Sequence, residues 1–466
     1  MQRDYYVEYF EFLDSLLWDF IAGTKLKYPD AFTIGGYCCE VPVVCFSYLY
    51  KYLSKNKEFY SQLRKEGKSK KQVQCILRSE LDKTVNHNFT QPSVVQSKDN
   101  DDLYSLFYPY RNQIFIYIYN RRQLDYLIPL IRQLNQPVLL VSEFELPDET
   151  DLPGYVTAME IEFLKEKYYS PFLYDNFPHV YHYVNTFDQL LSFLQPRCTL
   201  LLEGCHFQQE IIAVISKSMS IPSICIQQGW PSILNSYFRN MQYAYYFTWG
   251  NLFNRLWSER NEIPCFVPAG YMYDILPSSG KKYITFFLLP PLVISDNAYF
   301  RMSLDFLMQC AVLFPEQLFC VKEHPEYRIP DDYRNQLHMH GNIIDVSNEP
   351  LSEIYAGTML VVSHFSSCLM EGIAHGCIPF VFDPASESRF NPDIENMGLG
   401  IIASNLEEAV LKMRKFLSTS VQRDCFLRKM NEIKDDLFAS HGKDTRKKMV
   451  EYINNIVVFG QLDFEL

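Results

Sequence analysis

The chain has 466 residues, enough for about three domains of roughly 150 residues each, and its content of 48% apolar and 21% charged residues is typical of a globular protein. This composition excludes a disordered, collagenous or coiled-coil chain. The 43 Lys and Arg residues against 55 Asp and Glu residues leave a net charge of −12, so no overall field attracts nucleic acid. Any anionic ligand must therefore meet a local site, and we expect no nucleic-acid partner.

The first twenty residues place Asp and Glu among their apolar positions, which does not fit a signal peptide. No stretch of about 18 apolar residues lacks a charge, so no membrane span is predicted. The thirteen cysteines are odd in number and lack the spacing of a disulfide framework or a zinc site. We therefore expect a cytoplasmic protein.

Residues 1–105 are predicted to form a helical N-terminal extension, because apolar residues recur at three- and four-residue steps. A basic stretch at 65–71 follows a second apolar segment. Two interpretations stay open for this stretch: contact with an anionic membrane or glycan, or a solvated helix end.

Residues 106–277 alternate between short β-branched or aromatic runs and segments of helical spacing, which predicts a Rossmann-like domain with a parallel sheet. The predicted strands are 113–120, 137–142, 180–184, 199–204 and 223–227, and the predicted helices are 121–134, 187–194 and 208–218.

The same alternation predicts a second Rossmann-like domain over residues 278–420, after the turn-rich segment 277–280. Its predicted strands are 282–290, 317–322, 342–347, 359–363 and 378–383, and its predicted helices are 298–313, 351–356, 367–376 and 405–417. Residues 421–466 are predicted to form helices that pack back across the first domain.

The strand at 317–322 runs into Glu323, His324 and Pro325, at the carboxyl edge of the predicted parallel sheet. Loops at that edge bind ligands in α/β proteins. An imidazolium there can neutralise or protonate a phosphate, and the adjacent Lys322 adds positive charge. The alternative is a histidine bonded to the backbone at the end of a strand.

Two hydroxyls, Ser366 and Ser367, lie between the strand at 359–363 and the helix that follows it. Exposed N–H groups and hydroxyls at a helix start bind anions. The alternative is that one serine acts as an ordinary helix cap. Two such features at strand ends of one domain favour a phosphate site.

These motifs, in this order and spacing, resemble bacterial GT-B glycosyltransferases that use CMP-activated sugars, a group including sialyltransferases, polysialyltransferases and Kdo transferases. The resemblance spans about residues 111–415 and is greatest to the Kdo transferases of capsule and O-antigen lipopolysaccharide biosynthesis. It implies an α/β fold of the GT-B type, with two Rossmann-like domains facing a cleft. The matching residues are Lys322-x-His324-Pro325, Ser366-Ser367, Glu371-Gly372, Glu203-Gly204, Gln227-Gln228-Gly229-Trp230-Pro231, Phe238-Arg239-Asn240-Met241 and Trp249-Gly250.

In the second domain the resemblance implies that His324 contacts the CMP phosphate and assists its departure, while Ser366 and Ser367 hold that phosphate. Lys322, next to the His-Pro motif, and the loop at 344–346 would lie near the cytidine, and Glu353 would bind the ribose. Phosphate stabilisation by such groups needs no divalent metal, so no cofactor is expected besides the CMP-sugar donor.

In the first domain Glu203 ends a strand and precedes a glycine, and is predicted to be the catalytic base or nucleophile, or else a structural cap. Sialyltransferases have two acidic residues before this glycine, whereas here the first is Leu202. His206 is a second acid/base candidate. Where a retaining relative would place a carboxylate after Gln-Gln-Gly-Trp, this sequence has Ser232, which leaves that role empty.

The segment Gln227-Gln228-Gly229, together with Arg239, offers amides and a guanidinium for the carboxylate and hydroxyls of an acidic sugar. The alternative for the glutamines is that they hold the loop together.

We therefore hypothesise a transferase that moves an acidic sugar, Kdo, from CMP-Kdo to a cell-surface polysaccharide or lipopolysaccharide acceptor that is free or lipid-linked. The expected location is the cytoplasm, or the periphery of the inner membrane of a Gram-negative bacterium beside other polysaccharide-assembly enzymes. The alternatives are a CMP-sialic acid sialyltransferase, a CDP-glycerol-type polyol-phosphate transferase, a UDP-sugar transferase and a catalytically silent glycan-binding subunit.

Overall fold

The computed structural model describes residues 2–40, 57–85, 107–146, 152–161, 177–203, 206–229, 239–276, 280–289, 297–325, 327–364, 366–384 and 394–462. The chain forms two compact units. The N-terminal unit consists of Glu8–Gly229, Leu234–Met272 and Lys443–Leu466, and the C-terminal unit consists mainly of Tyr273–Gly442.

The N-terminal unit contains a seven-stranded parallel sheet in the order β5-β4-β3-β6-β7-β8-β9. Its central strands are buried over their whole length, as expected for a parallel sheet covered on both faces. The strands are β3 (Ile114–Ile118), β4 (Val138–Ser142), β5 (Val156–Glu160), β6 (Cys198–Leu202), β7 (Ser223–Ile226), β8 (Tyr245–Thr248) and β9 (Cys265–Pro268).

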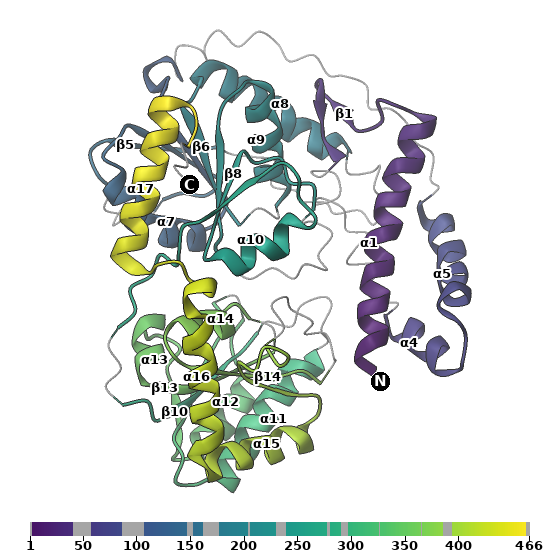
Figure 1. Cartoon of the computed structure of the whole chain (residues 1–466), viewed down its shortest axis with the longest axis vertical. Coiled ribbons are helices and arrows are strands. Elements are labelled where there is room, and N and C mark those ends of the chain that lie inside the picture. The colour runs from purple at the N-terminus through teal and green to yellow at the C-terminus, as the bar shows by residue number, and fades with distance from the viewer. Residues whose placement is uncertain are drawn as a thin grey trace. The chain divides into compact units, whose positions relative to one another are not determined.

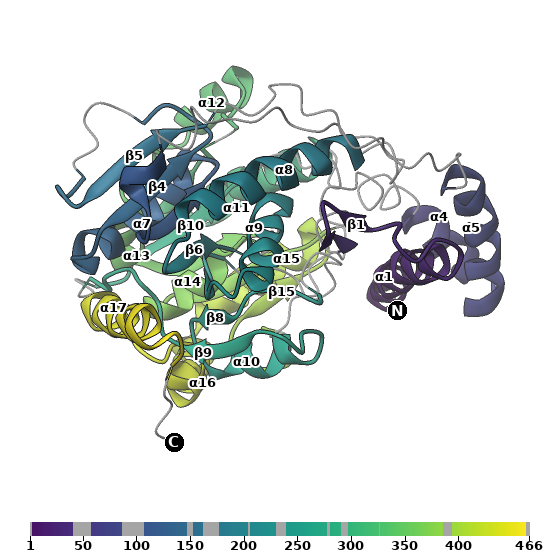
Figure 2. The ribbon, with the colours of Figure 1, turned by 90° about the horizontal axis from the view of Figure 1, so that it is seen from above.

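Helices cover both faces of this sheet. Helix α7 (Arg121–Leu134) begins where the Asn120 side chain accepts a hydrogen bond from the Gln123 amide at 2.9 Å. Helices α8 (Phe177–Leu194) and α9 (Phe207–Ser218) pack together on the face opposite α7, and α10 (Asn251–Ser258) lies between β8 and β9 in the chain (Figure 2).

The predicted strand at 180–184 is wrong, because these residues belong to α8. Its aromatic and β-branched residues suggested a strand, but the buried side chains Val180, Tyr183, Val184 and Phe187 recur with helical spacing. Among the described residues between β4 and α8, the strand is β5, at the edge of the sheet, which the apolar pattern did not reveal.

The C-terminal unit contains a six-stranded parallel sheet in the order β12-β11-β10-β13-β14-β15. The strands are β10 (Tyr283–Phe287), β11 (Phe319–Lys322), β12 (Ile343–Asp345), β13 (Thr358–Ser363), β14 (Ile378–Phe382) and β15 (Ile401–Ala403). The helices are α11 (Asn297–Leu313), α12 (Asp331–His338), α13 (Leu351–Gly357), α14 (Cys368–Ala374), α15 (Leu406–Ser418) and α16 (Ser420–Leu437), with α11 packed beside α15 (Figure 1).

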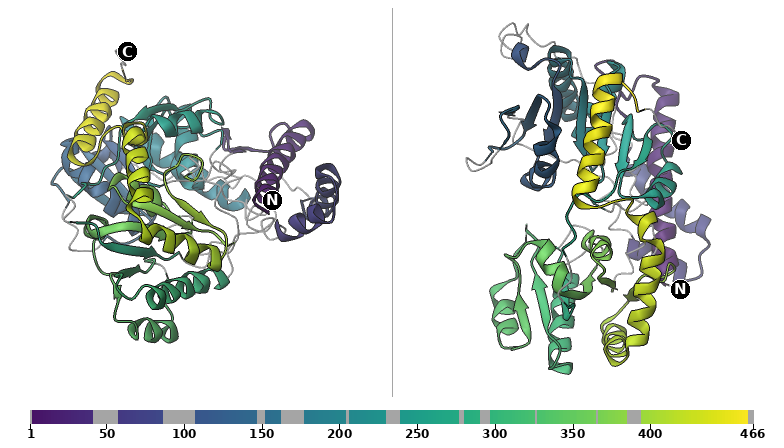
Figure 3. Two further views of the ribbon diagram at one scale, coloured as in Figure 1. Left: turned by 60° about the horizontal axis from the view of Figure 1, so that its bottom comes forward. Right: turned by 60° about the vertical axis from the view of Figure 1, so that its left-hand side comes forward.

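The last helix, α17 (Gly442–Phe459), returns to the N-terminal unit (Figure 3). Lys448 Nζ donates to the Pro268 carbonyl at 3.0 Å, and the rings of Tyr452 and Phe247 lie 5.7 Å apart. The predicted fold class is confirmed in its two Rossmann-like parallel sheets of the GT-B type and its C-terminal helices. Of these helices α17 packs back on the N-terminal unit, whereas α16 is part of the C-terminal unit.

In its described residues, 2–40 and 57–85, the N-terminal extension contains the helices α1 (Gln2–Lys27), α4 (Lys57–Lys65) and α5 (Lys70–Val85). It also contains a short antiparallel hairpin of β1 (Thr33–Ile34) and β2 (Tyr37–Cys38). The buried Asp14 of α1 accepts hydrogen bonds from Arg239 at 2.9 Å and Arg260 at 3.4 Å, which attaches α1 to the N-terminal unit. Within the described ranges, every helix is too short or too polar to cross a bilayer.

Candidate functional site

Each sheet has one point where the strand order reverses, and ligands in open α/β sheets bind at the carboxyl ends of the strands beside that point. In the N-terminal unit the reversal lies between β3 and β6, and Glu203 follows β6 directly. In the C-terminal unit it lies between β10 and β13, and Ser366 and Ser367 follow β13. The predicted groups therefore lie at the two positions where topology favours a ligand.

Glu203 has a left-handed backbone conformation, with a φ of 71°. A residue other than glycine is strained there, and such strain gathers at functional sites. Its amide donates to the Ile226 carbonyl at 2.9 Å, and its carbonyl accepts from the Tyr246 hydroxyl at 2.7 Å. These bonds fix the direction in which the carboxylate projects.

The Glu203 carboxylate pairs with His206, whose Nε2 lies 3.3 Å from Oε2. The His206 ring also lies 4.6 Å from the ring of Tyr119, which follows β3 on the other side of the strand-order reversal. Burial raises the pKa of Glu203, but the hydrogen bond and charge of His206 and the charge of Arg122 outweigh it, so the pKa lies below its ordinary value. Glu203 and His206, which the sequence suggested as separate acid/base candidates, thus form a carboxylate–imidazole pair in the structure.

Glu143, directly after β4, was missed by the sequence analysis. Its carboxylate accepts a hydrogen bond from the Tyr117 hydroxyl and another from Gln208 Nε2 at 3.4 Å. Burial, followed by the charge of Glu143, raises the pKa of Tyr117 well above its usual range. Its position directly after a predicted strand could have identified Glu143 as a candidate site residue from the sequence.

The described residues directly after β7, 227–229, belong to the N-terminal unit. Gln227 is buried: its Nε2 donates to the Gly229 carbonyl at 2.9 Å and its Oε1 accepts from the Trp249 amide at 2.8 Å. These bonds favour the loop-holding interpretation for Gln227. Gln228 is also buried, and Ser232 lies outside the described residues.

Arg239 contacts the N-terminal extension. Its guanidinium pairs with Asp14 at 2.9 Å and lies 5.3 Å from the ring of Trp18. The contacts of Arg239 are thus those of a residue that attaches α1 to the sheet.

In the C-terminal unit, Lys322 connects the end of β11 to the loop after β12. Its Nζ donates to the carbonyls of Ser347 at 2.6 Å and Glu349 at 2.9 Å. Burial lowers the pKa of this ammonium group. Lys322 therefore holds the segment directly after residues 344–346, which the resemblance assigns to the cytidine.

Glu323, between Lys322 and His324, is buried and fixes the His-Pro turn. Its carboxylate accepts hydrogen bonds from Arg334, from Arg328 at 3.0 Å and from the Ile329 amide at 2.9 Å. The turn closes where the His324 carbonyl accepts from the Tyr327 amide at 3.0 Å, with Pro325 exposed. Sequence reasoning missed this role of Glu323.

We expect Glu323→Ala to lower the free energy of unfolding by about 2–3 kcal/mol, because it leaves the partly buried Arg334 without a buried charged partner. Urea denaturation measures this loss. Arg328→Ala is the matched control, since the Arg328 side chain is 74% exposed and should cost at most about 0.5 kcal/mol. Equal effects of the two variants would contradict the role assigned to Glu323.

Ser366 and Ser367 are both partly exposed, and the Ser366 hydroxyl accepts from the Cys368 amide at 3.2 Å. Their loop and that of His324 follow strands that both pair with β10, so about 10 Å separates the two strands. His364 is buried, with Nδ1 3.0 Å from the Phe382 carbonyl. Glu353 is exposed on α13.

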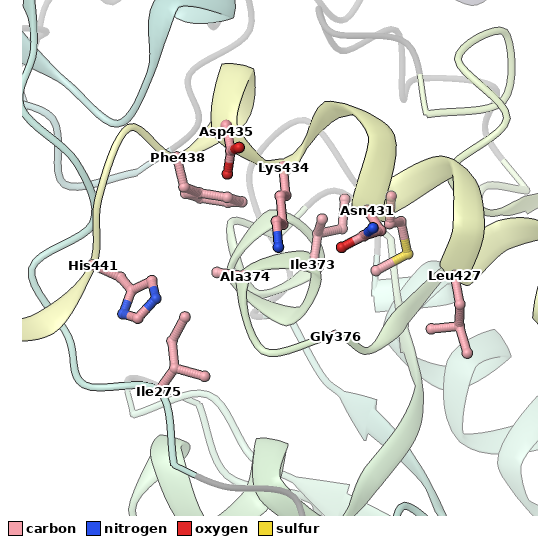
Figure 4. A pocket seen from close by; sticks show the side chains of 11 residues that line it. Ile275, Ile373, Ala374, Gly376, Leu427, Asn431, Lys434, Asp435, Phe438 and His441 are labelled. Carbon is pink, nitrogen blue, oxygen red and sulfur yellow. The ribbon is translucent and has the colours of Figure 1, made fainter.

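A separate cavity of about 390 Å³ lies in the C-terminal unit, at the end of α14 away from the two serines. Figure 4 shows apolar side chains of α14 and α16 with Lys434, Asn431 and His441 around them. Nearby, burial, helped by the charges of Lys281 and His441, lowers the pKa of His375 to about 4. None of the predicted site residues lines this cavity.

Within the part of the chain that the structure describes, no group of three or more His, Cys, Asp or Glu side chains is arranged to hold a metal ion.

No protein-family model matches the sequence, and a search of curated proteins finds no match. Solved structures share the fold. The UDP-GlcNAc 2-epimerase from Neisseria meningitidis bound to UDP-GlcNAc is 11% identical, with a TM-score of 0.52 over 73% of this chain and 99% of that one. MnaA from S. aureus with UDP is 10% identical, with a TM-score of 0.51 over 76% and 99%. The wall teichoic acid polymerase TagF is 14% identical, with a TM-score of 0.46 over 77% and 92%. At these identities the two matches with TM-scores above 0.5 show a shared fold and nothing further.

Proposed function

We propose that the protein is a glycosyltransferase that moves an acidic sugar from a CMP-activated donor to a glycan acceptor. The observation that carries the proposal is the strained Glu203, paired with His206 beside the strand-order reversal of the first sheet. In the second sheet, the hydroxyls predicted to meet phosphate occupy the equivalent position. The motif resemblance selects CMP-Kdo as the donor.

The proposed chemistry divides between the units. Glu203 accepts the proton of the acceptor hydroxyl, and His206 holds the carboxylate ionised and oriented. His324 stabilises the departing CMP phosphate, with Ser366 and Ser367 donating hydrogen bonds to its oxygens. Side chains of this chain thereby meet the developing charge without a metal ion.

The proposal is tested by calorimetric titration with CMP, CDP and UDP. CMP should bind most tightly, and Ser366→Ala/Ser367→Ala should weaken CMP binding by about 1–3 kcal/mol, because charge-assisted hydrogen bonds are lost. Ser418→Ala/Ser420→Ala, two exposed serines of the same unit, is the matched control and should bind CMP as the parent does.

Three results would contradict the proposal in different ways. Preference for CDP or UDP would show that the donor is not CMP-activated. Unchanged CMP affinity in the Ser366→Ala/Ser367→Ala variant would show that the two serines do not bind the phosphate. CMP-Kdo that binds without being hydrolysed or transferred would favour the catalytically silent glycan-binding subunit.

A further inference from the structure

A groove of about 430 Å³ is lined by residues of α1 and α5 in the N-terminal extension, including Lys70 and Lys71 of the basic stretch at 65–71. Figure 1 shows the two helices. The proposed chemistry does not use it. Its α1 wall consists of Glu11, Phe12 and Ser15, and its α5 wall consists of Lys70, Lys71, Gln74, Cys75 and Arg78.

The groove is a positively charged place on an acidic molecule. Its lining carries the cations Lys70, Lys71 and Arg78 against the carboxylate of Glu11, whereas the whole chain has a net charge of −12. Lys70, Gln74 and Arg78 are spaced four residues apart, so they form one stripe along α5 that is about 12 Å long. Such a stripe suits an extended ligand with several negative charges better than one small ion.

The three cations that line the groove are accessible to a ligand. Lys71 is exposed and makes no hydrogen bond or ion pair with any other described residue. Lys70 lies 4.0 Å from Glu11 and Arg78 lies 2.5 Å from Asp19, yet both side chains are about half exposed. Exposed ion pairs of this kind contribute little to stability, so an incoming polyanion can replace them.

We propose that the α1–α5 groove binds an acidic segment of the acceptor glycan, an inference that rests on the proposed transferase function. Lys70, Lys71 and Arg78 would pair with sugar carboxylates, and Ser15 and Gln74 would bond to hydroxyls.

A lipid bilayer fits the groove less well. Membrane insertion would need exposed apolar side chains. Among the described residues of the extension, the large exposed apolar side chains do not line the groove; they are Leu26, Tyr28, Phe59 and Ile76.

The attachment of the extension to the N-terminal unit explains how glycan binding in the groove would help catalysis. Asp14 connects α1 to Arg239 and Arg260 of the N-terminal unit, the unit that carries Glu203. A glycan held in the groove is thereby tethered to the unit that acts on its growing end, which raises the local concentration of acceptor.

The test is a binding titration of the full chain, without donor, against a ten-residue oligogalacturonate as a defined acidic glycan. Its methyl-esterified form tests the charge, and phosphatidylglycerol vesicles test a membrane. Lys70→Gln/Lys71→Gln should weaken oligogalacturonate binding roughly tenfold or more, and salt should weaken parental binding. Lys27→Gln/Lys65→Gln, which removes the same charge outside the groove, should stay within about twofold of the parent.

Equal affinity of the Lys70→Gln/Lys71→Gln variant and the parent, no binding by the parent, or capture by vesicles in place of the oligosaccharide would overturn the inference. Because the titration contains no donor, it tests the groove independently of the proposed function. If the chain binds oligogalacturonate through the groove but turns over no nucleotide sugar, the groove proposal stands and the transferase proposal fails. Thermal melting confirms that each variant is folded.

Discussion

Glu203→Gln is expected to reduce sugar transfer at least ~100-fold while CMP affinity stays at the parental level. The substitution keeps the size of the side chain but removes the base, and the residues assigned to CMP lie in the C-terminal unit. Transfer from CMP-Kdo to candidate acceptors is measured beside calorimetric CMP binding. Transfer at near the parental rate would make Glu203 structural.

Glu203→Gly separates chemistry from structure at the same position. Glycine adopts a φ of 71° without strain, so this variant should melt no lower than Glu203→Gln and should be equally inactive. Because the pKa of Glu203 is lowered, the carboxylate stays ionised down to pH values below its ordinary pKa. The kcat/KM of the parent should therefore keep its neutral-pH level at mildly acidic pH, and an early acidic decline would point to another base.

His324→Ala is expected to lower kcat by about 10²–10³-fold with a much smaller effect on CMP affinity, because an imidazole that protonates the leaving phosphate acts mainly in the transition state. Added imidazole should restore part of the lost rate, which a merely structural histidine would not permit. His338→Ala, an exposed histidine on α12 of the same unit, is the matched control. Loss of CMP binding equal to the loss of kcat would assign His324 to ground-state binding.

Local sequence patterns predicted the elements whose apolar residues also form the core. The helix 121–134 was predicted with the boundaries it has in the structure, since Asn120 caps one end and seven buried residues follow one face. The strand prediction at 180–184 was wrong because a short run of Val and Tyr fits both the two-residue period of a strand and the 3.6-residue period of a helix. Tertiary burial against the sheet decided in favour of the helix.

From the sequence, the site residues that could be placed were those that directly follow a predicted strand. Glu203 and His324 follow apolar runs, so their placement at sheet edges could be inferred. The bond from Arg239 to Asp14 joins residues 225 positions apart, and no local pattern announces it. For the same reason the sequence suggested a sugar-binding role for Arg239 and did not reveal that Asp14 is its partner in the folded chain.

The return of α17 has a consequence for how the protein is made. Its buried face, with Met449, Ile453 and Ile456, covers the unit that contains Glu8–Gly229. During synthesis the continuous segment 273–442 is complete before that helix emerges, so it can fold first. Part of the apolar surface of the N-terminal unit stays uncovered until α17 has been synthesised. The half of the protein that is translated first is therefore the half that finishes folding last.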